Sequence, residues 1–484
     1  MLGFNVNIWC QVKEGIVKAG KFESWHNLGR FLGPAAVTFI LSSFAINLGL
    51  GRWGSYIGTP IQGLYLPDLL LIVGALLSLT QWRKAHLLPK TALIFVLPLF
   101  YLLLHTIYLV IRVPSSGYTL WLRDMAPFAY LSLVPLIALS LALLKPEVLV
   151  LVVRWSSIVY AIPFAAYQLG LIPTWVSSYM ISDSAPIFSY RADFTGFALG
   201  IGIVAWGRWG FDLNRNILIQ GCLLSVGLLD SSVAALLTLL TLLILSVIKD
   251  WSISKVLGGV KLVLVSLVAG IFLTFISAPS APSAPSAPSA PSAPSPETST
   301  DNASSWVPRA PGFSDLLVLA SAGTTSSRLD TWTDVGRYLT SGTNWFLGGG
   351  PGTDTLYFAC TGIGAAPETV MLVGADGEPT YLPRCAVDSA EAFSTLRDPH
   401  NWVLNLWIYH GIVGLLILSL TFVVPLWTRR SGTNYWLSAF GVVGILLVSS
   451  FGVVLSAPFG LVPLTIFIAY LYANRIRHKS SLDS

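Results

Sequence analysis

Charged side chains are scarce in this sequence. Asp, Glu, Lys and Arg together make up 11% of its 484 residues, whereas 54% are hydrophobic. Soluble domains carry about 25% charged residues. The shortage therefore excludes an ordinary water-soluble protein and indicates that lipid is the main solvent of the chain.

Two other features are missing. The first 30 residues are mixed polar, with Lys13, Lys18, Lys21 and Arg30, and no short apolar run directly follows these charges within them, so we expect no cleaved signal peptide. No cluster with metal-ligand spacing occurs in the long polar segment 277–400, so we expect no metal site there.

Cysteine is rare, with four residues in the chain. Cys360 and Cys385 share this long segment, and an oxidising compartment would permit a disulfide between them. The alternative is two unpaired thiols.

Long apolar runs are what the chain has in place of charge. About twelve of them are long enough, or nearly so, to cross a bilayer core of about 30 Å. They lie near 31–48, 64–81, 91–112, 125–144, 147–170, 193–209, 216–230, 232–249, 258–276, 401–427, 434–454 and 459–474. The sequence therefore predicts an all-α integral membrane protein with one large, partly helical outer loop between the ninth and tenth helices.

The distribution of basic residues predicts the orientation. With the N-terminal segment in the cytoplasm, every lysine falls on the cytoplasmic side. The only basic residues in the short outer loops are arginines, namely Arg52, Arg112, Arg123 and Arg191. This bias follows the positive-inside rule. The net charge of +5 therefore reflects topology, and we expect no nucleic-acid partner.

The same patterns divide the chain into six parts. They are a cytoplasmic segment 1–30, helices one to nine in 31–276, a Ser-Ala-Pro linker 277–297, an outer loop domain 298–400, helices ten to twelve in 401–474, and a basic cytoplasmic tail 475–484. Proline at every third position of the linker matches the polyproline II repeat, so this tract is interpreted as a disordered spacer.

The outer loop contains one predicted helix, at 326–342. Leu329, Trp332, Val335 and Leu339 fall on one face of it. The stretch FLGGGPGTD follows and is interpreted as a tight backbone bend, because no Lys-Ser or Lys-Thr follows its glycines as a phosphate-binding loop would require.

The stretch RDPHNWVLNLWIYHGIVG places polar residues at the start of the tenth predicted helix. Asp398 can cap this helix, and Pro399 fits its first position. His400 and Asn401 are then expected in the first turn, where the helix dipole attracts anions and disfavours imidazolium. His400 should therefore be neutral and able to accept a proton. The alternative is a surface histidine at a membrane interface.

The same helix carries a polar stripe below its start. Asn405 and Tyr409 follow Asn401 at helical spacing, so this face should turn towards protein or water. Gly411 and Gly414 are small residues of the kind that let helices pack closely. His410, deeper in the helix, is interpreted as a packing histidine with its hydrogen bonds satisfied.

Arginines at the outer ends of other helices are candidate anion ligands. Arg191 stands where the sixth predicted helix begins, and Arg123 with Asp124 stands at the outer end of the fourth. A guanidinium matches phosphate oxygens with two hydrogen bonds and keeps its charge. The alternative for Arg191 is an interfacial arginine that reaches lipid headgroups.

Several motifs in the second half of the chain occur in a familiar order. An Arg-x-x-x-Trp helix precedes a Gly-x-Gly-Pro-Gly turn, and a His-Asn-x-x-Leu segment then opens a helix that carries Gly-x-x-Gly. In addition, an Arg in the outer segment before a mid-chain helix is followed a few residues later by a Gly. The residues are Arg328 and Trp332; Gly348, Gly350, Pro351 and Gly352; His400, Asn401 and Leu404; Gly411 and Gly414; and Arg191 with Gly196. Over roughly 190–430 the sequence resembles the bacterial O-antigen ligase/polymerase family.

This resemblance implies a fold and an activity. The fold would be similar to the GT-C-type membrane glycosyltransferases. The activity would be transfer of a glycan from an undecaprenyl-diphosphate carrier to a lipid- or carrier-linked acceptor at the periplasmic face of the bacterial inner membrane. The expected partners are this donor, this acceptor and membrane lipid. No cofactor, metal or nucleotide sugar is expected, since an enzyme on the outer face needs a donor that arrives already activated.

The resemblance also implies roles for individual residues. Arg191 and Arg328 would clamp the donor diphosphate and stabilise the leaving group. His400 would accept the proton of the acceptor hydroxyl, and attack opposite the diphosphate would invert the anomeric configuration. Asn401, Arg337 and Arg397 would support the site. Trp332 and Trp345 could stack on sugar, and core packing is the alternative for Trp332.

Three alternatives remain open at this point. A polymerase that adds repeat units to a carrier-linked chain would show the same motifs as a ligase. A transporter of small solutes or inorganic carbon would have a similar helix count, with ionisable residues within broken helices at mid-membrane. A structural partner of a flippase, with an inert loop, is the third.

Overall fold

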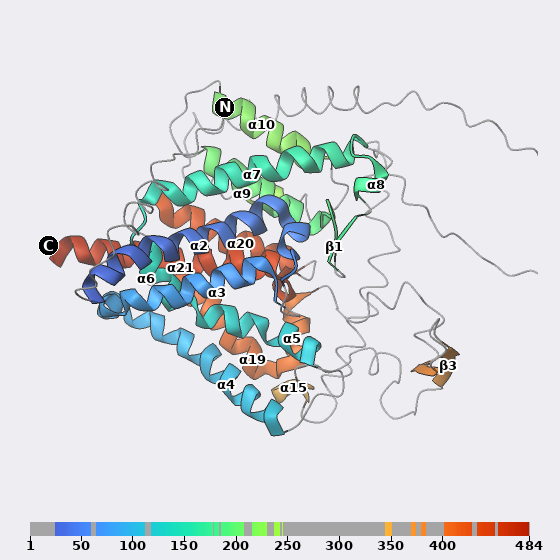
Figure 1. The fold of residues 1–484 in the computed structure, drawn as a ribbon, viewed down its shortest axis with the longest axis horizontal. Coiled ribbons are helices and arrows are strands. Elements are labelled where there is room, and N and C mark those ends of the chain that lie inside the picture. Colours follow the sequence, from blue (N-terminus) through green and yellow to red (C-terminus); the bar gives the residue numbers. More distant parts are fainter. Residues whose placement is uncertain are drawn as a thin grey trace, which may run out of the picture.

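The protein is a helical bundle, described here from a computed structural model (Figure 1). The structure describes residues 25–59, 64–111, 118–177, 179–182, 185–207, 215–229, 237–242, 244, 344–350, 369–373, 379–383, 401–427, 433–450 and 454–483. The first half of the bundle contains α2 (Trp25–Ser55), α3 (Leu66–Ser78), the 3-10 helices η1 (Leu79–Leu87) and η2 (Lys90–Phe95), α4 (Val96–Ile111), α5 (Tyr118–Ser132), α6 (Val134–Leu141) and α7 (Pro146–Gln168).

The second half contains short elements as well as long helices. They are α8 (Thr174–Ser177), α9 (Ala192–Gly207), α10 (Arg215–Gly227), α15 (Asn344–Leu347), α19 (Trp402–Leu426), α20 (Thr433–Ser449), η3 (Val454–Ser456) and α21 (Pro458–Asp483). Two antiparallel pairs of strands accompany them, β1 (Met180–Ser182) with β2 (Ala185–Pro186) and β3 (Thr369–Val373) with β4 (Pro379–Pro383). The described part is thus mostly helical but not purely so.

Five described helices are long and apolar enough to cross a membrane. They are Phe31–Ser55, Lys90–Ile107, Pro146–Gln168, Trp402–Leu426 and Pro458–Lys479. The bent pair Trp121–Ser132 and Val134–Leu141, with 43° between its halves, would be a sixth. The prediction of a mostly helical protein with membrane-spanning helices is confirmed. The count of about twelve spans stays a prediction.

Most of the predicted spans nevertheless coincide with a described helix. Segment 232–249 is described only at 237–242 and 244, and segment 258–276 lies outside the described residues. The helices α9, α10 and α20 stand at predicted places but are shorter than a full span. The Ser-Ala-Pro linker and the helix predicted at 326–342 also lie outside the described residues.

α21 forms the centre of the bundle. It packs against α2, α6 and α20, and 89% of its most apolar window is buried. Phe467 of α21 meets Phe44 of α2 edge to face, with ring centroids 5.2 Å apart. Near its C-terminal part, the Tyr470 hydroxyl donates to the Pro146 carbonyl at 3.0 Å. A helix that is apolar on all sides is expected in such a position.

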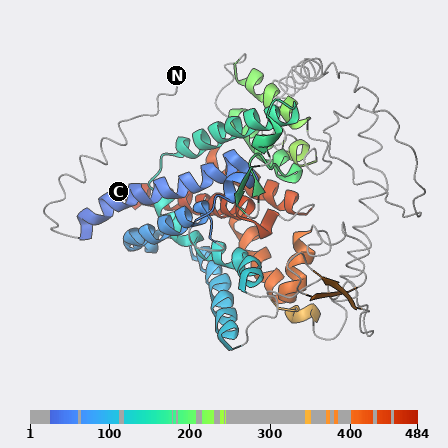
Figure 2. The same cartoon turned by 45° about the vertical axis from the view of Figure 1, so that its right-hand side comes forward.

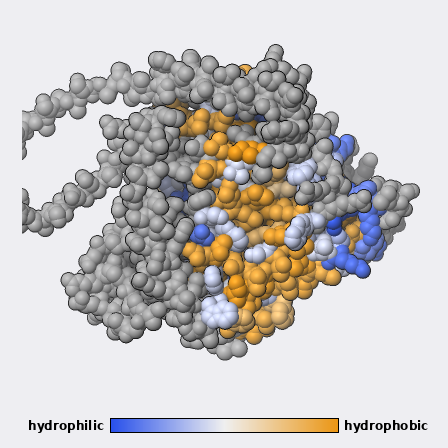
Figure 3. All heavy atoms as spheres, turned by 180° about the vertical axis from the view of Figure 1, so that it is seen from behind, coloured by the Kyte–Doolittle hydropathy of each residue, from blue (hydrophilic) through white to orange (hydrophobic). Residues whose placement is uncertain are grey.

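The outside of the bundle is largely apolar. Phe100, Leu103, Leu104 and Ile107 of α4 expose large hydrophobic side chains, as a helix in contact with lipid would. Figure 3 shows a broad hydrophobic area on one face of the molecule, with hydrophilic residues gathered at the end where the C-terminus lies.

The two ends of the bundle differ. At the end near the C-terminus, Arg477 donates to the Leu144 carbonyl and Lys479 to the His86 carbonyl. The opposite end carries α8, β1 and α15 (Figure 1), and we call it the α15 end. Figure 2 shows α15 beside α19 at this end. Of the candidate site residues that the structure describes, Trp345 lies in α15, Asn401 directly precedes α19 and Arg191 directly precedes α9.

Candidate functional site

Asn401 is the N-cap of α19. Its backbone is extended, and its Oδ1 accepts hydrogen bonds from the N–H groups of Val403 and Leu404 at 3.0 and 3.3 Å. The prediction that Asp398 caps the helix and that Asn401 lies in the first turn is therefore wrong, because the helix begins at Trp402. Asparagine caps a helix as well as aspartate does. His400, which precedes the cap, lies outside the described residues.

α19 is broken at Gly411. The residue has φ 61° and ψ −169°, a conformation that is essentially restricted to glycine. The carbonyls of Ile408 and Tyr409, shortly before the break, accept hydrogen bonds from segment 344–350. Gly349 N–H donates to Ile408 O at 2.8 Å, and Gly350 N–H donates to Tyr409 O at 3.1 Å. Because buried backbone groups in a membrane need partners inside the protein, this glycine turn stabilises the broken helix.

The contact between the turn and the helix requires glycine on both sides. A Cβ on Gly411 would lie 2.1 Å from the carbonyl oxygen of Phe346. A Cβ on Gly348, whose φ is 75°, would lie 2.6 Å from the nitrogen of Gly411. The indole N–H of Trp407 also donates to the carbonyl of Trp345 at 2.8 Å. The predicted tight bend is thus confirmed at 348–350, and Gly411 permits close packing, but against the loop.

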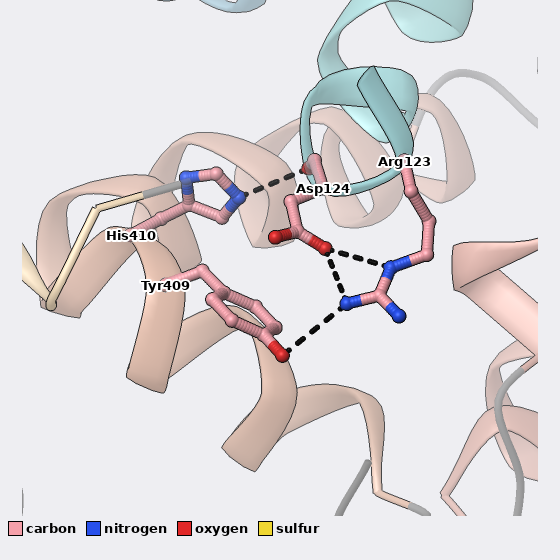
Figure 4. Close-up of polar contacts among 4 residues, drawn as sticks. All are labelled: Arg123, Asp124, Tyr409 and His410. Atoms are coloured by element: carbon pink, nitrogen blue, oxygen red, sulfur yellow. Dashed lines mark hydrogen bonds and ion pairs between the residues drawn. The ribbon is translucent and has the colours of Figure 1, made fainter. Parts of the chain in front are cut away.

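A polar cluster lies directly beside this break (Figure 4). Arg123 and Asp124 come from α5, and Tyr409 and His410 come from α19. Arg123 Nε and Nη2 contact Asp124 Oδ1 at 3.0 and 2.9 Å. Arg123 Nη2 also donates to the Tyr409 hydroxyl at 3.4 Å. The cluster therefore ties α5 to α19.

His410 is fully buried and makes two hydrogen bonds. Its Nε2 lies 3.1 Å from the Asp124 carbonyl oxygen, which can only accept, so Nε2 carries a hydrogen. Its Nδ1 lies 3.3 Å from the Tyr101 hydroxyl, which then donates. One neutral tautomer satisfies both contacts. The interpretation of His410 as a packing histidine with satisfied hydrogen bonds is confirmed.

Two residues of α4 belong to this cluster and were not identified from the sequence. The ring of His105 lies 4.4 Å from that of Tyr101 and 6.3 Å from that of His410, measured between centroids. The buried Nδ1 of His105 has no hydrogen-bond partner in the part of the chain that the structure describes. The available signal was a pair of polar rings, Tyr101 and His105, four residues apart in a largely apolar run.

Arg191 lies immediately before α9 and is half-buried. Its carbonyl accepts hydrogen bonds from the N–H groups of Phe194 and Thr195, both at 3.0 Å, and so begins the helix. Burial raises the pKa of Tyr56, while the charges of Arg52 and Arg191 both act to lower it. Both guanidinium charges therefore act on the hydroxyl of Tyr56, which directly follows α2.

The other predicted site residues are not part of the described geometry. Arg328, Trp332, Arg337, Cys360, Cys385, Arg397 and His400 lie outside the described residues. Trp345 is described, with half of its side chain exposed beside Phe346. Among the described residues, no three His, Cys, Asp or Glu side chains gather closely enough to hold a metal ion.

The structure thus joins two of the sequence motifs, the glycine turn and the helix that follows His400. The charges of Arg191 and Arg52 both act on Tyr56, which directly follows α2. No protein-family model matches the chain, and no curated protein matches it. The functional interpretation therefore depends on the residues and their geometry.

Proposed function

We propose that the protein is a glycosyltransferase of the O-antigen ligase type. It would transfer a glycan from a polyprenyl diphosphate to an acceptor hydroxyl at the α15 end. The protein would span the inner membrane of a bacterium, with the α15 end on the periplasmic side. The observation that carries this proposal is the pair of hydrogen bonds from Gly349 and Gly350 to Ile408 and Tyr409. They join two of the motifs that carry the resemblance, the glycine turn and the Gly-x-x-Gly helix.

This contact limits how far apart the proposed catalytic residues can lie. Asn401 stands about 11 Å along the helix from the docked turn, because the seven residues from Asn401 to Ile408 rise by about that much. The helix predicted at 326–342 would span about 25 Å and ends shortly before the turn. Arg328 and Arg337 lie in this predicted helix, so the contact limits the length of chain that separates them from the start of α19.

The proposed mechanism assigns one step to each group. Arg191 and Arg328 bind the diphosphate and stabilise the charge that develops on it as the sugar leaves. His400 accepts the proton of the attacking hydroxyl. The start of α19, with its cap at Asn401, presents the positive end of a helix dipole, which supports an anion and keeps His400 neutral. Attack opposite the diphosphate gives inversion.

The test is a transfer assay with the full chain in nanodiscs, a carrier-linked glycan and candidate acceptors. His400→Ala should lower kcat by about a hundredfold or more, the usual contribution of a general base. His86→Ala is the matched control, because His86 is exposed near the C-terminal end. If His400→Ala transfers glycan at nearly the wild-type rate, the proposal is wrong.

A polymerase of the same family is an alternative within this class. The assay separates the two by product, since a ligase moves a finished glycan to a new acceptor and a polymerase lengthens a carrier-linked chain. In cells, loss of a ligase should leave long carrier-linked glycan, whereas loss of a polymerase should leave single repeats.

A transporter of small solutes is the alternative of another class, and one observation favours it. α19 is broken at Gly411 beside Arg123 and Asp124, and broken helices with ionisable neighbours are typical of transporters. Uptake by proteoliposomes that survives His400→Ala, together with no glycan transfer, would support this alternative.

A further inference from the structure

The 3-10 helix η1 is unusually long, with nine residues, and its faces differ in character. Residues three apart share a face of such a helix. Gln81, Lys84 and Leu87 turn towards the protein, since Gln81 is buried and the other two are half-buried. Leu79 and Trp82 form an apolar face, and their side chains are 48% and 59% exposed. This apolar face is left without a cover inside the described part of the bundle.

The third face of η1 is basic. Arg83 and His86 lie on it, three residues apart, and both are exposed. Lys90, which begins η2, and Lys479, near the end of α21, are exposed as well. Lys479 Nζ donates to the His86 carbonyl at 3.3 Å, so this lysine lies against η1. Arg83, Lys90 and Lys479, which we call the η1 patch, form no ion pair with a residue that the structure describes.

η1 lies where two apolar helices meet the end of the bundle. It directly follows α3, and Lys90 begins a segment long and apolar enough to cross a membrane. Exposed apolar side chains continue from η1 in both directions, with Leu76 in α3 and Leu93 in η2 exposed by 57% and 69%. Figure 3 shows hydrophilic residues gathered at this end, next to the broad hydrophobic area. The basic groups of η1 therefore stand at the edge of a surface suited to acyl chains.

The arrangement is more specific than an excess of positive charge at one end of a membrane protein. Such an excess sets the orientation and requires no particular faces. A helix with an apolar face beside a basic face is typical of a segment that lies in the plane of the membrane surface. Tryptophan is also enriched at this depth, and basic clusters there attract anionic headgroups.

We propose that the η1 patch binds the phosphate of an anionic phospholipid, whose acyl chains lie against Leu79 and Trp82. The lipid belongs to the leaflet at the C-terminal end of the bundle, opposite the α15 end. This site is separate from the proposed glycan transfer and does not depend on it.

The test is native mass spectrometry of the full chain in detergent, with phosphatidylglycerol or phosphatidylcholine of the same acyl chains added. The wild type should bind phosphatidylglycerol more tightly by about tenfold or more, because each basic residue near an anionic surface contributes about fivefold. Arg83→Gln, Lys90→Gln and Lys479→Gln should each weaken binding of phosphatidylglycerol by about threefold to fivefold. Binding of phosphatidylcholine should stay unchanged in all three.

Two further variants separate this site from charge in general. Arg83→Lys keeps the positive charge and should bind phosphatidylglycerol within about twofold of the wild type. Arg52→Gln removes an arginine from the last turn of α2, at the opposite end of the bundle, and should also leave this affinity unchanged. Circular dichroism and gel filtration establish that each variant is folded.

Three outcomes would overturn the proposal. One is equal affinity of the wild type for the two lipids, which would leave the η1 patch to water or to an acidic protein. Another is unchanged binding of phosphatidylglycerol in the three glutamine variants. The third is displacement of the lipid by excess glycerol phosphate, which has the phosphate without acyl chains and would identify a site for soluble anions. Because no glycan is present in these measurements, the proposal and the proposed function can fail separately.

Discussion

Gly348 and Gly411 meet backbone to backbone: a Cβ on either residue would lie 2.6 Å from the amide nitrogen of the other. One belongs to segment 344–350 and the other to α19, a helix long and apolar enough to cross a membrane. No residue with a side chain fits at either position, so this contact fixes where the loop joins the bundle. It is the structural basis for treating the loop and α19 as one site.

Gly411→Ala should therefore be strongly destabilising. The conformation alone costs about 1–3 kcal/mol in a residue with a Cβ, and the collision with the Phe346 carbonyl should add to this. Gly170→Ala is the matched control, because Gly170 also has positive φ, 67°, but its Cβ would meet no atom within 4 Å. Thermal unfolding in detergent checks this, and equal losses for the two variants would contradict it.

Asn401→Ala should lower the free energy of unfolding by about 1 kcal/mol, since it removes the side chain that caps α19. Asn401→Asp should keep the cap and most of the stability. The same order should appear in glycan transfer, because the cap positions the segment that holds His400. Transfer that is reduced equally in both variants would indicate a direct role for the amide instead.

Trp407→Phe should loosen the loop. It removes the indole N–H that donates to Trp345 O, a bond worth about 0.5–1.5 kcal/mol. Limited proteolysis should show faster cleavage next to α15. Trp82→Phe, at an exposed position in η1, should leave the rate unchanged. A Trp407→Phe protein that resists protease as wild type does would show that the glycine contacts alone hold the loop.

Tyr101→Phe should destabilise the bundle by about 1–3 kcal/mol, because the buried Nδ1 of His410 would lose its donor. Nitrogen NMR of the wild type should show His410 neutral, with its hydrogen on Nε2. Tyr179→Phe, at an exposed site, is the control for the stability measurement. A hydrogen found on Nδ1 would contradict the assignment.

Arg191→Gln should reduce glycan transfer by about tenfold or more if this guanidinium binds the donor diphosphate. Arg154→Gln, which changes an arginine in α7 away from the α15 end, should leave transfer unchanged. The readout is initial rate against donor concentration, where a raised KM is expected. Unchanged kinetics for Arg191→Gln would assign Arg191 to the membrane surface.

Hydropathy predicted the positions of α2, α7, α19 and α21 well, because a membrane helix needs a long apolar run and little else. It did not predict the start of α19 to the residue. Asp398 and Asn401 are both good caps, and the choice between them depends on contacts that the local sequence does not contain.

The break at Gly411 was also not predictable from the pattern. A glycine in an apolar helix usually indicates close packing between helices, and only the approach of the loop makes it a break. The joining of Tyr101, Asp124 and His410 likewise depends on three helices that are distant in the chain. The sequence pointed to Asp124 and His410 but not to Tyr101, and it did not show that the three meet.

The central position of α21 has a consequence for biogenesis. Of the described helices it is the last to leave the ribosome, yet it fills the space between α2, α6 and α20. The helices inserted earlier therefore surround an incomplete interior during translation. Assembly of this bundle must be completed after insertion, when α21 enters and replaces whatever lipid occupied its place.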